Sequence, residues 1–264
     1  MFLVSILAVL TLAELPALAP DSAGVVEERL TYRVSWAGLT IGRIRLVTQL
    51  SSNPDSTGLR RVTAAIDSKA GIPFVRLHFR AETEFDSLGK TLSFRSYEQD
   101  GNVWVGTEYE YEQDRRAVRM EEFECAFPSG PRGSIRQCDT LPLPSGDVQD
   151  GISLVFFARR IVQVPQAFTV PTVSYGRVGM TIGTAARNRE DVSVDACPRP
   201  IRTVELTGRL DVKGIFGLTG DYRGWFSDDR AAVPIRAEMK VLIGSVVVEL
   251  ESWSRDGWEP PQVE

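Results

Sequence analysis

Residues 203–213 read TVELTGRLDVK, a strict alternation of apolar and polar side chains. Residues 76–85 (RLHFRAETEF) and 233–241 (VPIRAEMKV) follow the same rule. Successive side chains of a β-strand point to opposite faces, so each stretch predicts a strand with one face on a core and the other in water. Such strands are typical of antiparallel sheets.

Turn signals separate these stretches from further short strands. Ala37-Gly38, Asp100-Gly101 and Gly244-Ser245 are examples, and segments of five to ten residues between such turns indicate hairpins and meanders. About a dozen strands can form a barrel or two packed sheets. We therefore predict an all-β fold, in which a large antiparallel meander closes into a barrel-like or two-sheet structure with one short buried helix.

One strand carries an irregularity. Between residues 39 and 50 the apolar positions change parity, and Gly42 lies at the change. A glycine inside a strand often marks a bulge, so we expect a β-bulge or bend at this position.

The segment 152–162, ISLVFFARRIV, breaks the alternation. It is apolar on almost every side of a helix, Asp147 or Asp150 can cap its start, and Arg159 and Arg160 suit its last turn. A helix of this kind must be buried. The competing interpretation is a continuous buried strand.

A helix at this position can serve a ligand. Placed across an open barrel end, it would act as a lid whose inner face touches both core and ligand. Ile152, Val155 and Phe156 are the candidate ligand-binding residues. The alternative is a helix that only plugs the barrel.

Motifs for catalysis, metals and nucleotides are missing. The only histidine, His78, is expected on the polar face of its strand, and there is no G-x-S-x-G or phosphate-binding loop. Asp228 and Asp229 are explained more simply by a turn than by acid–base or calcium chemistry. We therefore expect no catalytic residues, no metal and no cofactor, and we interpret the chain as a non-enzyme.

Charge argues against a nucleic-acid partner. The 264 residues carry a formal net charge of −5, and 43% are hydrophobic. No Lys/Arg-rich run is present, and a basic footprint is the minimum for binding nucleic acid.

The N-terminus indicates export. Residues 2–13 (FLVSILAVLTLA) are uncharged, and Ala17-Leu18-Ala19 forms a small-x-small cleavage pattern. We predict a signal peptide at 1–23, a single β domain at 24–254 and a flexible tail at 255–264. The mature chain then has no stable transmembrane span and is periplasmic or associated with the outer envelope. A buried N-terminal helix or strand is the alternative.

Three cysteines are present. Cys125 and Cys138 are 13 residues apart, around a segment rich in Gly and Pro, and Cys197 is left over. In an oxidising compartment such a spacing predicts a disulfide between Cys125 and Cys138. Three unpaired thiols are the alternative.

Several stretches resemble one family. Residues 28–39 (ERLTYRVSWAGL) with Gly42, residues 150–159 (DGISLVFFAR) and residues 220–250, with SDDRAAVPIR and IGSVVVEL, are similar to bacterial exported proteins grouped as domain of unknown function 3108. The resemblance extends over most of residues 25–252. It implies export, an antiparallel β fold and no established activity, and it supplies no catalytic residues.

Three functions remain open. The first is an exported envelope protein that binds an apolar or amphipathic ligand, such as a lipid, or takes part in envelope maintenance. An envelope protein is a further candidate partner. The second is a non-enzymatic structural or interaction module of the envelope with a filled core. The third, a hydrolase or lyase, requires convergent polar groups in a cavity.

Overall fold

The fold of the protein is given by a computed structural model, which describes residues 24–51, 58–71, 77–112, 115–214, 219–241 and 244–263. In these ranges the chain forms 14 strands and one helix, α1 (Ser153–Ile161). The strands are β1 (Gly24–Trp36), β2 (Leu39–Ser51), β3 (Arg60–Ser68), β4 (His78–Phe85), β5 (Thr91–Asp100), β6 (Val103–Glu112), β7 (Ala117–Cys125), β8 (Ile135–Pro142), β9 (Gln166–Ser174), β10 (Arg177–Val192), β11 (Ile201–Leu210), β12 (Gly220–Ser227), β13 (Pro234–Lys240) and β14 (Ser245–Arg255). The predicted signal peptide, residues 1–23, lies outside the described residues.

All 14 strands belong to one antiparallel sheet. Its order runs from β8 back to β1, then from β14 back to β9, so that β1 pairs with β14. Neighbours in the sheet are otherwise neighbours in the chain, and tight turns join β1 to β2, β5 to β6 and β9 to β10. Gly38 and Gly101 occupy such turns with φ of 79° and 61°, a conformation in which glycine is favoured. The predicted antiparallel meander is confirmed.

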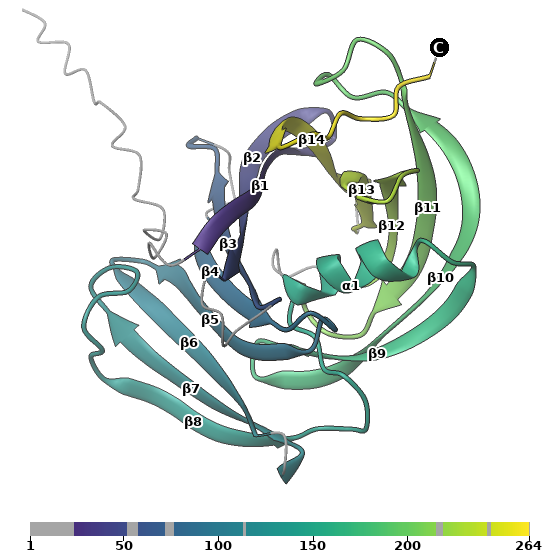
Figure 1. Ribbon diagram of the computed structural model, residues 1–264. Coiled ribbons are helices and arrows are strands. Elements are labelled where there is room, and N and C mark those ends of the chain that lie inside the picture. The colour runs from purple at the N-terminus through teal and green to yellow at the C-terminus, as the bar shows by residue number, and fades with distance from the viewer. Residues whose placement is uncertain are drawn as a thin grey trace, which may run out of the picture.

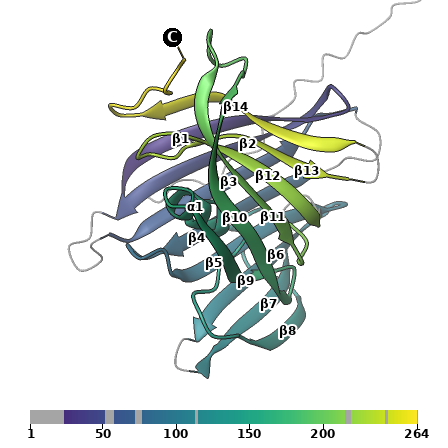
Figure 2. The ribbon, with the colours of Figure 1, turned by 90° about the vertical axis from the view of Figure 1, so that its right-hand side faces the viewer.

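The sheet curls around α1 into a barrel-like shape (Figures 1 and 2). It does not close through strand pairing, since β8 and β9 are its two edges. The residues before α1 bridge part of the opening. Gln149 N donates to the carbonyl oxygen of Pro171 at 2.9 Å, and Val173 N donates to that of Gln149 at 2.8 Å.

Strands β6 to β8 extend away from the barrel as a flap (Figure 1). Every residue of the edge strand β8 is exposed except the half-buried Leu141. At the base of the flap, Tyr109 Oη accepts a hydrogen bond from Gly176 N at 2.9 Å, so the β9–β10 turn is fixed against β6.

The core side of β4 follows the predicted alternation with one exception. Phe79, Ala81 and Phe85 of β4 are buried, as expected. Arg80 is also buried, with 1% of its surface exposed, although its strand pattern predicts a solvated side chain. Its guanidinium donates to the Phe79 carbonyl oxygen at 2.9 Å and to Asp67 Oδ1 at 3.0 Å, which compensates for the desolvation of the charge.

The predicted disulfide between Cys125 and Cys138 is wrong for this structure, in which both thiols are free. In the β7–β8 register, Cys138 lies opposite Glu121, and Glu121 precedes Cys125 by four positions on β7. At about 3.3 Å per residue the two are far beyond the reach of a disulfide. Cys125 is instead buried beside Tyr97, Trp104 and Phe123.

The C-terminal residues also differ from the expectation of a flexible tail. Trp258 is 8% exposed and packs edge-on against Trp253, with ring centroids 5.9 Å apart. Arg202 N donates to the Pro261 carbonyl oxygen at 2.8 Å. The tail is therefore packed against β11 and β14 as far as Val263.

Candidate functional site

The start of α1 is fixed by a buried carboxylate. Asp150, with 0% of its surface exposed, accepts hydrogen bonds at Oδ1 from the backbone N of Ile152 at 2.7 Å and of Ser153 at 3.0 Å. Ser153 Oγ accepts from Asp150 N at 2.8 Å in return, a reciprocal cap. Thr83 Oγ1 donates to Asp150 Oδ2 at 2.6 Å. The helix predicted for residues 152–162 is confirmed, and Asp150 is the capping residue.

Burial changes the acidity of this group. Desolvation raises the pKa of Asp150, and the hydrogen bonds from Thr83 and from the backbone of Ser153 and Ile152 only partly oppose it. The carboxyl is therefore more easily protonated than an ordinary aspartate, while either form can accept from the two backbone N–H groups.

The last turns of α1 are held by a buried ionic group. Glu28 on β1 is 1% exposed and pairs with both Arg159 and Arg255, the latter at 2.8 Å from Arg255 Nη1 to Glu28 Oε2. Arg159 Nη2 also donates to the Ala231 carbonyl oxygen at 2.9 Å. Burial alone would raise the pKa of Glu28, but the two guanidiniums outweigh it and lower that pKa. These contacts tie α1 to β1, β14 and the β12–β13 turn.

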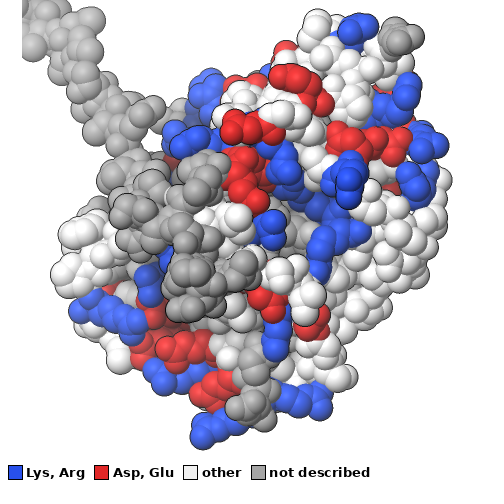
Figure 3. All heavy atoms as spheres, in the orientation of Figure 1, with Lys and Arg blue, Asp and Glu red and all other residues white. Residues whose placement is uncertain are grey.

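A polar hollow lies on this side of α1, at the barrel end where β1 and β3 begin and β2 and β4 end. Its volume is about 450 Å³, and we call it the mouth pocket. In Figure 3, Lys and Arg side chains gather over this region, with acidic side chains at its border. The residues with ionisable side chains in its lining are Glu27, Glu28, Arg60, Asp86, Arg159, Arg160, Arg230 and Arg255.

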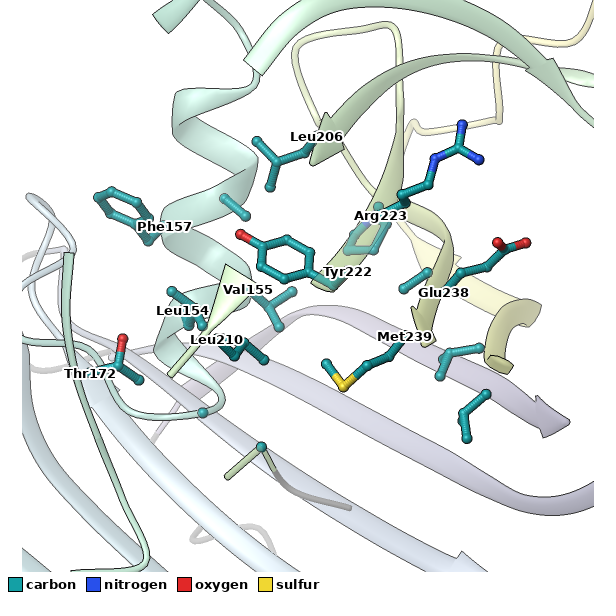
Figure 4. A pocket seen from close by; sticks show the side chains of 18 of the residues that line it. Leu154, Val155, Phe157, Thr172, Leu206, Leu210, Tyr222, Arg223, Glu238 and Met239 are labelled. Carbon is teal, nitrogen blue, oxygen red and sulfur yellow. The ribbon is translucent and has the colours of Figure 1, made fainter. Parts of the chain in front are cut away.

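A second hollow, the inner cavity, lies between α1 and strands β9 and β11 to β14. Its volume is about 280 Å³. Apolar side chains dominate the lining shown in Figure 4, among them Leu154, Val155, Phe157, Leu206, Leu210 and Met239. Arg223 and Glu238 also contribute to the lining, but in Figure 4 their charged groups extend away from the apolar side chains. An apolar cavity of this kind is suited to an apolar ligand.

The structure separates the three predicted ligand-binding residues. Val155 lines the inner cavity. Ile152 is 1% exposed and packs in the core with Val62 and Ile66. Phe156 lines the mouth pocket instead, and its ring centroid lies 5.1 Å from that of Phe85. One of the three predicted residues therefore lines the inner cavity, and the other two lie elsewhere.

Sequence reasoning missed Leu154 and Phe157, which line the inner cavity. Neither was among the three candidate ligand-binding residues. Because the helix is apolar on nearly every side, its pattern does not define which face meets the cavity. The rotation is set by Asp150 and Arg159, whose partners lie on distant strands.

The remaining polar candidates have structural partners. Asp229 Oδ1 accepts from Ala231 N at 2.9 Å and from Ala232 N at 3.0 Å, so the predicted turn at Asp228-Asp229 is confirmed. His78 Nδ1 lies 3.0 Å from Asp67 Oδ1. Among the described residues, no three His, Cys, Asp or Glu side chains are grouped to hold a metal ion. In the same ranges no helix is long and apolar enough to cross a membrane.

The fold has a counterpart among solved structures. It is similar to the crystal structure of a β-barrel-like protein of domain of unknown function DUF1849 from Brucella abortus, with a TM-score of 0.56 and 13% sequence identity. The match covers 88% of this chain and 99% of that one, and at this identity it shows the fold alone. No curated protein matches the sequence.

The sequence itself matches a family model over residues 31–251, described as protein of unknown function (DUF3108). This range runs from β1 to β14 and includes α1, the mouth pocket's arginines at 60, 159, 160 and 230, and the whole lining of the inner cavity. The chain therefore belongs to the DUF3108 family of proteins of unknown function.

Proposed function

We propose that this protein is an exported, non-enzymatic envelope protein that binds the apolar part of a lipid or another amphipathic molecule in its inner cavity. The observation that carries the proposal is the apolar lining of that cavity by α1 and strands of the barrel. Apolar space inside a protein loses dispersion contacts unless something fills it.

The anchoring of α1 supports a preformed site. Its first turn is capped by the buried Asp150, and its last turns are fixed by Glu28 through Arg159. A wall that is held at both ends loses little entropy when a ligand binds against it. Leu154, Val155 and Phe157 can therefore present a fixed apolar surface to the ligand.

The size of the cavity limits what can enter. At about 280 Å³ it is near the lower end of the range of small-molecule sites, about 300–1,000 Å³. Each buried methylene contributes about 0.8 kcal/mol before the costs of ordering are subtracted. We therefore expect one medium-length alkyl or acyl chain rather than a whole multi-chain lipid.

A second candidate function is a structural or interaction module. The exposed edge strand β8 favours it, because an unpaired edge can accept a strand from a partner. In that case the inner cavity is only a packing defect, and an envelope protein partner binds the flap.

A fluorescent fatty acid titrated into purified protein distinguishes the two. We expect saturable binding by the wild type and a loss of at least about tenfold in affinity for Val155→Phe, which fills the cavity with a larger side chain. Val164→Phe makes the same change at a residue that is 58% exposed and outside the cavity lining, so it should bind like the wild type. Absence of saturable binding by the wild type would leave the interaction module as the better proposal.

Export has its own test. The apolar run at residues 2–13 and Ala17-Leu18-Ala19 place the cleavage after about 19–23 residues. N-terminal sequencing of protein from the envelope should give a chain that begins there. Protein recovered from the cytoplasm that begins at Met1 or Phe2 would exclude this part of the proposal.

A further inference from the structure

We infer that the mouth pocket is a binding site for an anionic group, a phosphate or carboxylate, held by Arg160, Arg230 and the hydroxyl of Thr48. This site lies on the side of α1 facing Phe85 and Ala231, away from the inner cavity. It does not rest on the proposed function, because a free anion and the head group of an amphiphile present the same chemistry to these side chains.

The first observation is the local charge. The lining of the mouth pocket holds five arginines and three carboxylates, a formal charge of +2, in a protein whose net charge is −5. The three carboxylates are already engaged. Glu27 pairs with Arg60, Glu28 pairs with Arg159 and Arg255, and Asp86 accepts from the backbone N of Leu88 and Lys90.

The excess charge belongs to two exposed arginines. Within the described residues, neither Arg160 nor Arg230 forms an ion pair, while every other arginine of the mouth pocket has one. The Arg160 guanidinium lies 5.9 Å from the ring centroid of Phe157. It also lies close to Gly89, since a Cβ atom added to Gly89 would be 2.5 Å from Arg160 Cζ. Its place against the wall of the pocket is therefore restricted by packing.

The second, independent observation is an unpartnered hydroxyl. Thr48 on β2 lines the mouth pocket and is only 3% exposed, and its Oγ1 has no hydrogen-bond partner in the part of the chain that the structure describes. A buried polar atom without a partner costs about 1–3 kcal/mol, so such atoms are rare and call for an explanation. An anion in the pocket would accept a hydrogen bond from this hydroxyl.

Together these groups match the requirements of an anion. Guanidinium groups bind phosphate and carboxylate through charge-assisted hydrogen bonds, and a hydroxyl donor adds direction. The neighbouring Arg159 and Arg255 stay committed to Glu28, so they contribute positive potential without having to move.

The test uses isothermal titration calorimetry of the full mature chain with two probes, inorganic phosphate and dodecyl phosphate below its micelle concentration. We expect the double variant Arg160→Gln/Arg230→Gln to weaken binding of either probe by at least about tenfold, given the strength of hydrogen bonds to charged groups. Thr48→Val, which keeps the shape of the side chain, should weaken it by about three- to tenfold.

Controls separate a local effect from a change in total charge. Arg43→Gln/Arg209→Gln removes the same charge from residues outside the mouth pocket, with side chains 64% and 59% exposed. This variant should bind both probes as the wild type does. Both arginine variants should keep the unfolding temperature of the wild type within a few degrees, because none of the substituted arginines is buried.

The two probes identify the source of the anion. Dodecyl phosphate that binds at least about tenfold more tightly than phosphate, with binding of both probes weakened in Arg160→Gln/Arg230→Gln, assigns the site to the head group of an amphiphile. Equal affinities assign it to a free anion. The inference would be overturned if the wild type bound neither phosphate nor dodecyl phosphate. It would also be overturned if the Arg160→Gln/Arg230→Gln variant or the Thr48→Val variant bound the probes with wild-type affinity. Dodecyl phosphate binding that only Val155→Phe weakens would overturn it while leaving the proposed function intact.

Discussion

Arg159 of α1 and Glu28 of β1 form a buried ion pair between positions that are 131 residues apart in the chain. Arg159 Nη2 lies 3.2 Å from Glu28 Oε2, and the two side chains are 10% and 1% exposed. The pair thus connects the single helix of the described residues to the strand at the centre of the sheet order, and the rotation of α1 depends on it.

Replacing Arg159 should destabilise the fold strongly. Arg159→Met leaves Glu28 buried with Arg255 as its only cation, so we expect the free energy of unfolding to fall by about 3 kcal/mol. Urea denaturation at pH 7 measures this. Arg43→Met removes an exposed arginine paired with Glu251 and should cost below about 1 kcal/mol. Equal losses in the two variants would show that the buried pair has no special role.

The same pair makes the protein sensitive to acid. The folded pKa of Glu28 is lowered, so its contribution to stability is present above the unfolded pKa, about 4.3, and is lost as the pH falls through the folded value. Between pH 7 and pH 3 the wild type should therefore lose more stability than Glu28→Gln does. Urea denaturation of both proteins across this range tests it, and parallel curves would contradict the prediction.

Asp150 has the opposite dependence on pH. Its folded pKa is raised, so the stability that it contributes is complete below the unfolded pKa, about 3.9, and declines as the pH rises through the folded value. Asp150→Asn keeps an oxygen that can accept from the N–H groups of Ile152 and Ser153. We expect this variant to lack the decline above pH 4 that Asp150 produces in the wild type. Thermal unfolding from pH 4 to 8 compares the two proteins.

The strands could be predicted from the sequence because their signals are local. Gly42 is a good example. The register of β1 and β2 shifts beside it, between Val34 and Ser35, where the change of parity of the apolar positions predicts a bulge or bend. An added Cβ at Gly42 would lie 2.7 Å from the Asp67 carbonyl oxygen on β3, which explains the need for glycine. The alternation of apolar and polar residues, together with the turn residues, was therefore enough to predict most of the meander.

The candidate site was less predictable because it depends on contacts between distant strands, such as the pair of Arg159 with Glu28 on β1 that fixes α1. Two features outside the site have the same cause. Arg80 follows the polar parity of β4, yet it is buried through hydrogen bonds to Asp67 and to the backbone. Cys125 and Cys138 have suitable spacing for a disulfide, but the β7–β8 register separates them. Neither the partner of a buried charge nor a strand register across an irregular loop is encoded in a short stretch of sequence.

The cysteines should differ in reactivity. Cys138 is exposed, whereas Cys125 is buried and desolvation raises the pKa of its thiol. In native protein kept without reductant, we expect iodoacetamide to label Cys138 rapidly and Cys125 only after unfolding. Mass spectrometry of the labelled peptides measures both rates. A Cys125 peptide linked to a Cys138 peptide would contradict the structure.

Removing the packed tail should cost stability. Trp258 Nε1 donates to Asp229 Oδ2 at 2.8 Å and its ring lies in the cluster that contains Trp225 and Leu250. We expect Trp258→Ala to lower the free energy of unfolding by about 3 kcal/mol, as truncation of a large buried side chain does. Chemical denaturation measures it, with the exposed Tyr175→Ala as a large-to-small comparison that should cost less. A change below about 0.5 kcal/mol would indicate that the tail is loosely attached in solution.

Phe156→Ala separates a structural role of α1 from a ligand-binding role. Phe156 packs on Phe85, Arg159 lies 5.3 Å from its ring centroid, and it is not among the residues that line the inner cavity. Because the ring is partly exposed, we expect a loss of about 2 kcal/mol, below the value of about 3–5 kcal/mol for a fully buried phenylalanine. Binding of a fluorescent fatty acid should be unchanged, in contrast to its loss in Val155→Phe. A small loss of stability combined with weakened binding would instead place Phe156 in contact with the ligand and would require α1 to rotate from the position that Arg159 and Glu28 define.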